Sequence, residues 1–467
     1  YHLFTDAAGL GVLGSYAALE YAKHVLGGLS ADGEIGMREA GTFGGLLLVA
    51  GHLGMAFEGE AAQQTAQGIV RDTQALSVFY LSLALIVVGV GFLKPNISTV
   101  VGKLYPVDDP RRDAGFTIFY MGINIGAFSA TLLCGWLGEV YGWSWGFGAA
   151  GIGMLLGLIV FQWGQQYLMG HGEPAEPKQL KHSVGLPGLT VERSIYLGSL
   201  LMVAVVWQLV QLTATVGTLL DVLSLTVLAG LGWFLVFRCN KVERERMFVL
   251  IMLTLSTVIF WALFEQGAGS MTLYADRVTD KTLFGVSLTA AQFGAANSFF
   301  IFSLAPLFAM LWIRLGQRGW EPSTPVKFSL GIAQAGLGFG ALVYGAQFPD
   351  QAGVVSAWWL IVAYLLHTTG ELCLSPVGLS AVTKLAVPSV VGVMMGTWFL
   401  ASAYSSYVAA QIATIAARPS DESTLDLSGA LTGYTELFSQ LLYIGLAGGV
   451  VLLMLSPLLK RMMHGVR

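Results

Sequence analysis

Long apolar runs, separated by short charged or glycine-rich connections, extend over almost the whole sequence. Only 11% of the residues are charged, whereas a soluble globular domain carries roughly 25%. A soluble surface, a disordered chain and a nucleic-acid-binding face all need more charged or polar residues than this, so these classes are excluded. The pattern predicts an all-α polytopic membrane protein. Its expected surroundings are membrane lipid, and we expect no nucleic-acid partner.

The apolar runs predict about thirteen membrane-spanning helices, because a helix needs about 20 apolar residues to cross a bilayer. Each run is bounded by breaks that are rich in charge, proline or glycine. The runs cover residues 10–29, 41–57, 75–101, 115–139, 143–168, 194–214, 217–237, 248–268, 290–312, 328–344, 356–380, 392–417 and 434–459.

The basic residues indicate the orientation of these helices. Most of the 24 Lys and Arg residues fall in alternate connections and at the C-terminus. The opposite connections hold only Arg71, Arg277, Lys281 and Arg418. The positive-inside rule therefore predicts a cytoplasmic C-terminus. An odd number of spans then places Tyr1 outside, so we expect one further helix before this residue.

Two polar stretches divide the predicted helices into three groups. Residues 1–169 form an N-terminal helical bundle that lacks its first helix. Residues 170–246 hold a linker and an inserted two-helix hairpin, and residues 247–467 form a C-terminal six-helix bundle. Two six-helix bundles with a two-helix insert favour the major facilitator fold, in which substrate binds between the repeats near the bilayer midplane.

Three ionisable residues lie deep in predicted spans, namely Lys94, Glu265 and Glu371. Each costs roughly 2.5 to 3.5 kcal/mol at mid-bilayer, so it needs a partner or an aqueous cavity. Lys94 belongs to the N-terminal half and both glutamates to the C-terminal half. A cavity between them would have a positive and a negative pole and would suit a zwitterion. The alternative is a structural ion pair between Lys94 and one glutamate, and a gate can combine both roles.

Uncharged polar residues accompany these charges. Ser375 is four residues after Glu371, so both lie on one helical face, next to Pro376. The amides of Asn124, Gln266, Gln292 and Asn297 lie in otherwise apolar spans. Each amide either bonds a substrate or forms a hydrogen bond between helices.

Two long motifs carry a family resemblance. Residues 119–126 read FYMGINIG and match the pattern FYxxINxG, and residues 370–385 match GExxLSPxGLSxVTKL. Shorter matches lie at residues 91–96, 260–266 and 394–399. From about Gly41 onward the sequence resembles the proton-dependent oligopeptide transporter family of the major facilitator superfamily, and the two-helix insert resembles its bacterial members.

The resemblance implies symport of di- and tripeptides with protons across the cell inner membrane by alternating access. Lys94 would attract the peptide carboxylate, and Glu371 and Asn297 would hold the amino terminus. Lys94, Glu265 and Glu371 would take part in proton coupling or gating. The proton is then the coupling ion, and no cofactor, metal or catalytic residue is expected.

The remaining substrate-binding residues also follow from the resemblance. Asn124 would bond the peptide backbone, and Trp261 and Trp398 would line side-chain pockets. Ser375, on the Glu371 face, completes the predicted set.

The chain departs from the family pattern in two places. The family's first helix, with its ExxERFxYY motif, is absent from this sequence. In the stretch from Glu20 to Gly41, Glu20 and Lys23 occupy a span that family members keep apolar, and residues 32–39 read DGEIGMRE where DRxxGxRK is usual. Either Glu20 and Lys23 pair at i,i+3, or the stretch is altered, so we assign neither residue a role.

Two other functions compete with peptide symport. A related carrier can take another zwitterionic or anionic solute, such as nitrate, but the combination of Lys94 with Glu371 favours a zwitterion. An integral-membrane enzyme is disfavoured, because the seven histidines form no close set and no nucleophile elbow is present.

Overall fold

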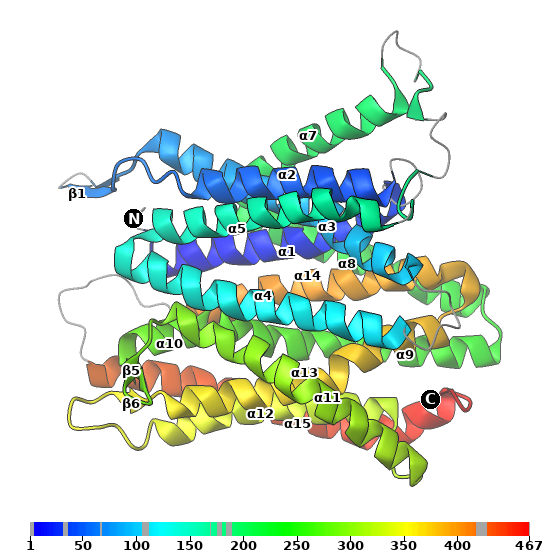
Figure 1. Ribbon diagram of the computed structural model, residues 1–467. Helices are drawn as coiled ribbons and strands as arrows, with labels where there is room; N and C mark the ends of the chain where they lie inside the picture. The colour runs from blue at the N-terminus through cyan, green and yellow to red at the C-terminus, as the bar shows by residue number, and fades with distance from the viewer. Residues whose placement is uncertain are drawn as a thin grey trace. The chain divides into compact units, whose positions relative to one another are not determined.

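The computed structural model is built almost entirely from helices, and each predicted apolar run coincides with one of them (Figure 1). The structure describes residues 4–30, 36–65, 68–104, 112–168, 170–174, 180–183, 189–416 and 427–466. Residues 31–35, within the stretch from Glu20 to Gly41, lie outside the described residues, as do the side chains of residues 21–30.

The first part of the chain forms helices that overlap the predicted apolar runs. These are α1 (Asp6–Ser30), α2 (Met37–Met55), α3 (Thr73–Lys103), α4 (Arg112–Tyr141), α5 (Trp143–Gly164) with the 3-10 turn η1 (Gln165–Leu168), α7 (Val191–Val210) and α8 (Thr213–Phe237). An antiparallel hairpin of β1 (Gln63–Thr65) and β2 (Gly68–Val70) joins α2 to α3, with Gln64 opposite Ile69.

The second part continues with α9 (Lys241–Phe264), η2 (Glu265–Gly267), α10 (Ser270–Val278), η3 (Ala291–Gly294), α11 (Ala295–Gln317), α12 (Thr324–Gly345), α13 (Trp358–Leu385), η4 (Pro388–Val390), α14 (Val391–Ala416) and α15 (Leu427–Met462). Strand β3 (Thr279–Asp280) pairs in parallel with β6 (Val355–Ser356), and β4 (Thr282–Leu283) pairs antiparallel with β5 (Val286–Ser287).

Ten helical segments in the described residues are long and apolar enough to span a membrane. Helices α1, α2 and α14, which the sequence also predicts as spans, are not among the ten. Helix α2 carries Arg38, Glu39 and His52 together with several glycines, and these residues lower its hydropathy.

The chain folds into two compact units that differ from the predicted succession of bundles. Unit 1 comprises Tyr1–Phe4, Ser15–Ile123 and Leu133–Val216. Unit 2 comprises Thr5–Gly14, Asn124–Leu132 and Gly217–Arg467. The inserted hairpin is thus shared, with α7 in unit 1 and most of α8 in unit 2, and the predicted three-part division stays a prediction.

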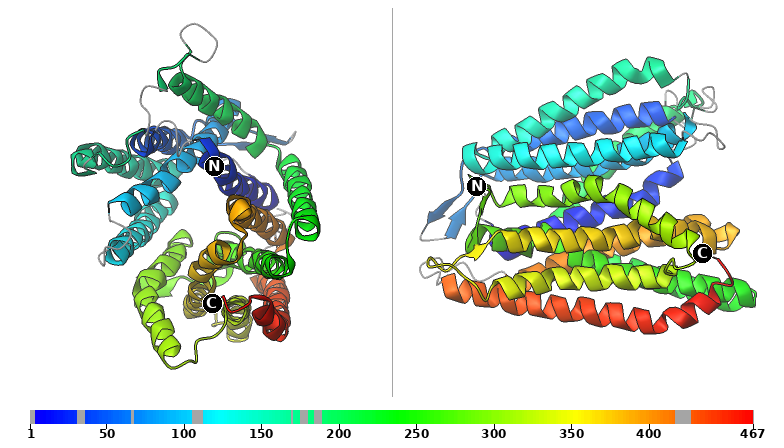
Figure 2. Two further views of the ribbon diagram at one scale, coloured as in Figure 1. Left: turned by 90° about the vertical axis from the view of Figure 1, so that its right-hand side faces the viewer. Right: turned by 60° about the horizontal axis from the view of Figure 1, so that its bottom comes forward.

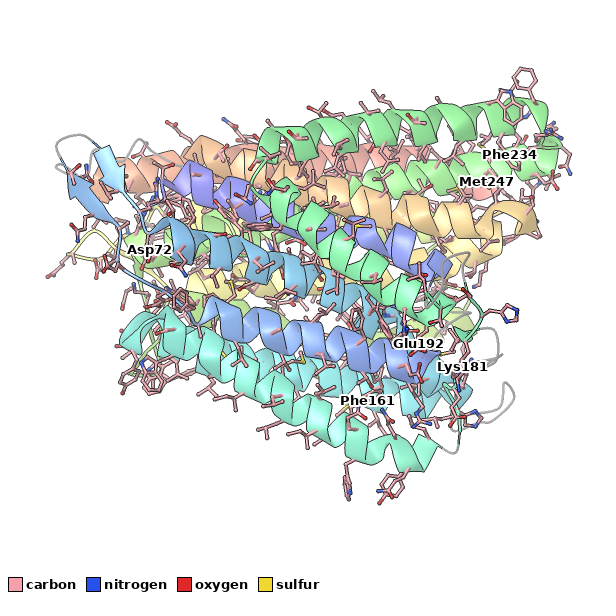
Figure 3. All side chains as sticks on the ribbon, turned by 90° about the horizontal axis from the view of Figure 1, so that it is seen from above. Asp72, Phe161, Lys181, Glu192, Phe234 and Met247 are labelled. Carbon is pink, nitrogen blue, oxygen red and sulfur yellow. The ribbon has the colours of Figure 1, made fainter. Side chains whose placement is uncertain are left out.

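Unit 1 is organised around α2, which packs against α3 and α5. Gly44 of α2 and Gly89 of α3 face each other so closely that a Cβ on Gly44 would lie 2.6 Å from the Gly89 carbonyl oxygen. Helix α3 begins where Asp72 accepts hydrogen bonds from the amides of Gln74 and Ala75, which satisfies two donors of its first turn. Figure 3 shows Asp72 where the β1–β2 hairpin leads into α3.

Unit 2 contains the larger apolar core, in which α12 packs against both α13 and α15 (Figure 2). Gly336 of α12 and Gly445 of α15 make the closest approach, since a Cβ on Gly445 would lie 2.5 Å from the Gly336 Cα. Small residues of this kind let two helices approach in an apolar environment.

Helix α9 begins with a capping box between Asn240 and Glu243. This box fixes the start of the helix that leads to Glu265. The sequence predicts one continuous span over residues 248–268. The structure instead breaks the helix at η2 and continues it as α10.

Candidate functional site

One face of α13 carries Tyr364, Thr368 and Glu371, at positions i, i+4 and i+7. The Thr368 hydroxyl donates to the Tyr364 carbonyl oxygen at 2.7 Å. Asn297 of α11 approaches this face, and its Nδ2 donates to Thr368 Oγ1 at 3.0 Å and to Glu371 Oε2 at 3.2 Å. The amide therefore orients the Glu371 carboxylate and connects α11 to α13.

A cavity of about 370 Å³ lies beside this cluster in unit 2. Glu265 and Asn297 both line it, so a second carboxylate faces the space that Asn297 borders. Glu265 reaches this position because α9 ends there and the chain turns through η2. The Tyr364 hydroxyl donates to the Gly267 carbonyl oxygen at 3.2 Å and ties this turn to α13. One carboxylate at the cavity wall, and a second that Asn297 bonds next to it, suit a cationic group of a ligand.

Aromatic rings form one wall of the site. Phe264 lines the cavity, and the Trp261 ring packs edge-on against it with 5.2 Å between centroids. The Trp261 Nε1 is buried with no hydrogen-bond partner in the described part of the chain. Trp261 does not itself line the cavity, so its role beside a substrate side chain stays a prediction.

Trp398 lies in a different setting from the predicted pocket wall. Its side chain is 5% exposed, and its ring packs against Phe328 of α12. It also lies directly over Gly378, where an added Cβ would collide with the ring. Trp398 is not among the residues that line the 370 Å³ cavity, so its role in a side-chain pocket stays a prediction.

Three other predicted site residues lie on three different helices. Ser375 is half-buried on α13, and Asn124 is buried in the segment of α4 that belongs to unit 2. Lys94 is exposed on α3 in unit 1, directly before the internal Pro95. The structure thus brings Asn297, Glu371 and Glu265 to one region of unit 2. The dipolar site that includes Lys94 stays a prediction.

Two of the four predicted amides, Gln266 and Gln292, donate to backbone carbonyls of other helices. Gln266 is fully buried, and its Nε2 donates to the Ala409 carbonyl oxygen of α14 at 2.9 Å. Gln292 donates to the Leu132 carbonyl oxygen of α4 at 3.0 Å. These contacts match the interhelical alternative for Gln266 and Gln292, whereas Asn297 bonds the glutamate of the candidate site.

Sequence reasoning missed Thr368 and Tyr364. Thr368 accepts the Asn297 amide, and Tyr364 lines the cavity and holds the η2 turn. Their spacing from Glu371 was a usable signal, because residues three, four and seven positions apart share a helical face. His367 also lines the cavity, with Nε2 3.0 Å from the Ala335 carbonyl oxygen.

In the described residues, ten helices long and apolar enough to span a membrane, with a carboxylate and an amide at an internal cavity, are typical of a membrane transporter. The family model described as "POT family" matches residues 40–430, and the chain belongs to this family of multi-pass membrane transporters.

Known relatives and solved structures agree with this assignment. The Bacillus subtilis transporter YclF is 36% identical over all of this chain and 90% of its own length. The "Peptide transporter YePEPT" of Yersinia enterocolitica is 34% identical over 86% of this chain and 78% of its own. A crystal structure of a mutant peptide transporter POT in complex with alafosfalin is 35% identical. It matches with a TM-score of 0.76 over 98% of this chain and 87% of that chain.

Proposed function

We propose that this protein is a symporter that imports di- and tripeptides together with protons by alternating access. The observation that carries the proposal is the Glu371 carboxylate, which accepts a hydrogen bond from Asn297, a residue that lines the same cavity as Glu265. A peptide amino terminus is a cation with three N–H donors, and an oriented carboxylate is the group that binds it best. The names of the relatives support a peptide as substrate.

The opposite end of the peptide is assigned to Lys94. Lys94 lies within the membrane-spanning helix α3, and its ammonium has the charge that binds a peptide carboxylate. Asn124, Ser375, Trp261 and Trp398 complete the proposed substrate site, with Asn124 on the peptide backbone and the indole rings beside its side chains.

Proton coupling is assigned to the same carboxylates. Glu265 lines a cavity in an apolar helix bundle, and Glu371 is bonded to Asn297 of the same lining. In such surroundings a carboxylate can take up and release a proton as its environment changes during the transport cycle. In the proposed topology the protein lies in the cell inner membrane with its C-terminus in the cytoplasm, as the distribution of basic residues favours.

Uptake of labelled dialanine into proteoliposomes tests the role of Glu371. We expect Glu371→Gln to abolish accumulation against a gradient, because the neutral amide binds an ammonium weakly and cannot carry the proton. Glu436→Gln is the matched control, since Glu436 is a glutamate on α15 outside the candidate site, and it should transport at the wild-type rate. Normal accumulation by Glu371→Gln would show that the assigned carboxylate is wrong.

A further inference from the structure

A buried histidine at the 370 Å³ cavity has no part in the function proposed above. His367 of α13 is 1% exposed and is one of the residues that line this cavity. Its ring packs against Phe339, with 4.9 Å between ring centroids, and against Phe264, with 6.3 Å. Gly338 of α12 leaves space for the ring, because a Cβ there would lie 2.4 Å from His367 Cδ2. The surrounding residues therefore hold the imidazole in one place.

The hydrogen bonds of His367 assign different roles to its two nitrogens. Nε2 lies 3.0 Å from the Ala335 carbonyl oxygen, which only accepts, so the hydrogen of the neutral ring is on Nε2. Nδ1 is then an acceptor, and it makes no hydrogen bond in the described part of the chain. Unlike Trp261 Nε1, it is not fully enclosed by protein atoms. The cavity that His367 lines is the space open to this acceptor.

The other polar side chains at the cavity use their hydrogens within the protein. The hydroxyls of Thr272 and Tyr364 both donate to the Gly267 carbonyl oxygen, at 2.8 and 3.2 Å. The Asn297 Nδ2 donates to two acceptors on α13. Glu265 is the remaining polar side chain of the described lining, and an ionised carboxylate only accepts. The described side chains at this cavity therefore present acceptors and no spare donor.

A wall of acceptors favours a ligand group that brings its own donors. An ammonium has a positive charge and three N–H donors, whereas a carboxylate has none to offer and would be repelled by Glu265. The volume of about 370 Å³ lies at the lower end of the roughly 300–1,000 Å³ range of ligand pockets. The cavity thus fits the amino-terminal end of a short peptide, and the Nδ1 of His367 is an acceptor for one of its N–H groups.

We propose that His367 Nδ1 accepts an N–H of the peptide ammonium and makes the site select a primary amino group. This inference rests on the proposed function, because it adds an acceptor for the same end of the substrate. Glu265 attracts any cation through its charge, but a ring nitrogen needs an N–H directed at it. A methyl group in that position makes no hydrogen bond, and the imidazole cannot turn away because Nε2 is bonded to Ala335.

Binding of two peptides to the purified full chain in nanodiscs, measured by calorimetry, tests the proposal. One peptide is dialanine, and the other is dialanine with two methyl groups on its amino nitrogen. The dimethylated ammonium keeps its charge and one N–H, which a carboxylate takes because that bond is the stronger one. We expect the wild type to bind the dimethylated peptide about tenfold more weakly or worse, since it loses hydrogen bonds to a charged group.

Three variants separate the acceptor from the packing. His367→Phe keeps an aromatic ring and removes the acceptor. Its affinity for dialanine, and its preference for dialanine over the dimethylated peptide, should both fall about tenfold. His367→Gln can donate to the Ala335 carbonyl and keep an amide oxygen at the cavity, so it should restore part of the preference. His52→Phe, on α2 in unit 1, is the matched control, because its ring bonds the Leu48 carbonyl of its own helix.

Each outcome decides the proposal. A merely structural role would weaken the binding of both peptides equally, so an unchanged preference in His367→Phe overturns the proposal and leaves the proposed function in place. Equal affinity of the wild type for the two peptides also overturns it, and this result needs no variant to fold. If the wild type does not bind dialanine at all, the proposed function is wrong and the role of His367 is wrong with it.

Discussion

The geometry of the candidate site depends most on the side chain of Asn297. Its Nδ2 reaches both Thr368 and Glu371, so one side chain of α11 sets the position of the carboxylate on α13. A carboxylate with a fixed partner keeps one orientation toward its ligand, whereas an unpartnered one samples several rotamers. Asn297 therefore positions Glu371 in addition to any direct contact with a peptide.

Asn297→Ala should raise the KM for dialanine about tenfold, which is the cost of one hydrogen bond to a charged group. Peptide analogues that lack the amino group should lose little, because their binding does not use Glu371. Gln347→Ala, at an exposed position after α12, provides the control. An equal loss for both kinds of ligand would mean that Asn297 supports the fold and not the amine site.

In unit 2, helices α12 and α15 cross at a very short distance. At the crossing of α12 and α15, Gly336 and Gly445 leave no room for a side chain. The core around them includes Phe328, Phe339 and Phe438, all fully buried. A shift of either helix would disturb this packing, since closely packed interiors transmit strain.

Gly445→Ala should lower the apparent melting temperature by several degrees, because overpacking of a well-packed contact costs about 1 to 3 kcal/mol. The control is Gly230→Ala on α8, where an added Cβ meets no heavy atom within 4 Å in the described structure. This variant should be unchanged or slightly more stable, because alanine favours a helix over glycine. Equal melting temperatures for both variants would contradict the close crossing.

The apolar runs predicted the helices because every helix that crosses a bilayer needs about 20 mainly apolar residues. They did not predict the break at η2, since residues 248–268 are apolar or weakly polar apart from Glu265 and Gln266. The family resemblance placed both Asn297 and Glu371 at the peptide amino terminus, and this predicted that they lie close together. The contribution of Thr368 did not, because a threonine hydroxyl in a membrane helix usually bonds its own backbone. Trp398 is buried because its ring lies over Gly378. This contact joins two helices, so the sequence around either residue does not predict it.

The complete chain combines separate apolar cores with polar groups confined to a few places. In unit 2 these places include the cavity beside Glu371 and the cavity beside Lys327. The first is the proposed site for the amino terminus of a peptide.

Coupled proton entry is the most direct test of peptide symport. Liposomes that contain the full-length protein and an internal pH dye are mixed with dialanine at equal pH on both sides and with a negative internal potential. We predict internal acidification on addition of dialanine and none on addition of free alanine, because the proposed substrates are di- and tripeptides. Dialanine entry without acidification would contradict proton coupling. No entry of dialanine by folded protein would contradict peptide transport itself.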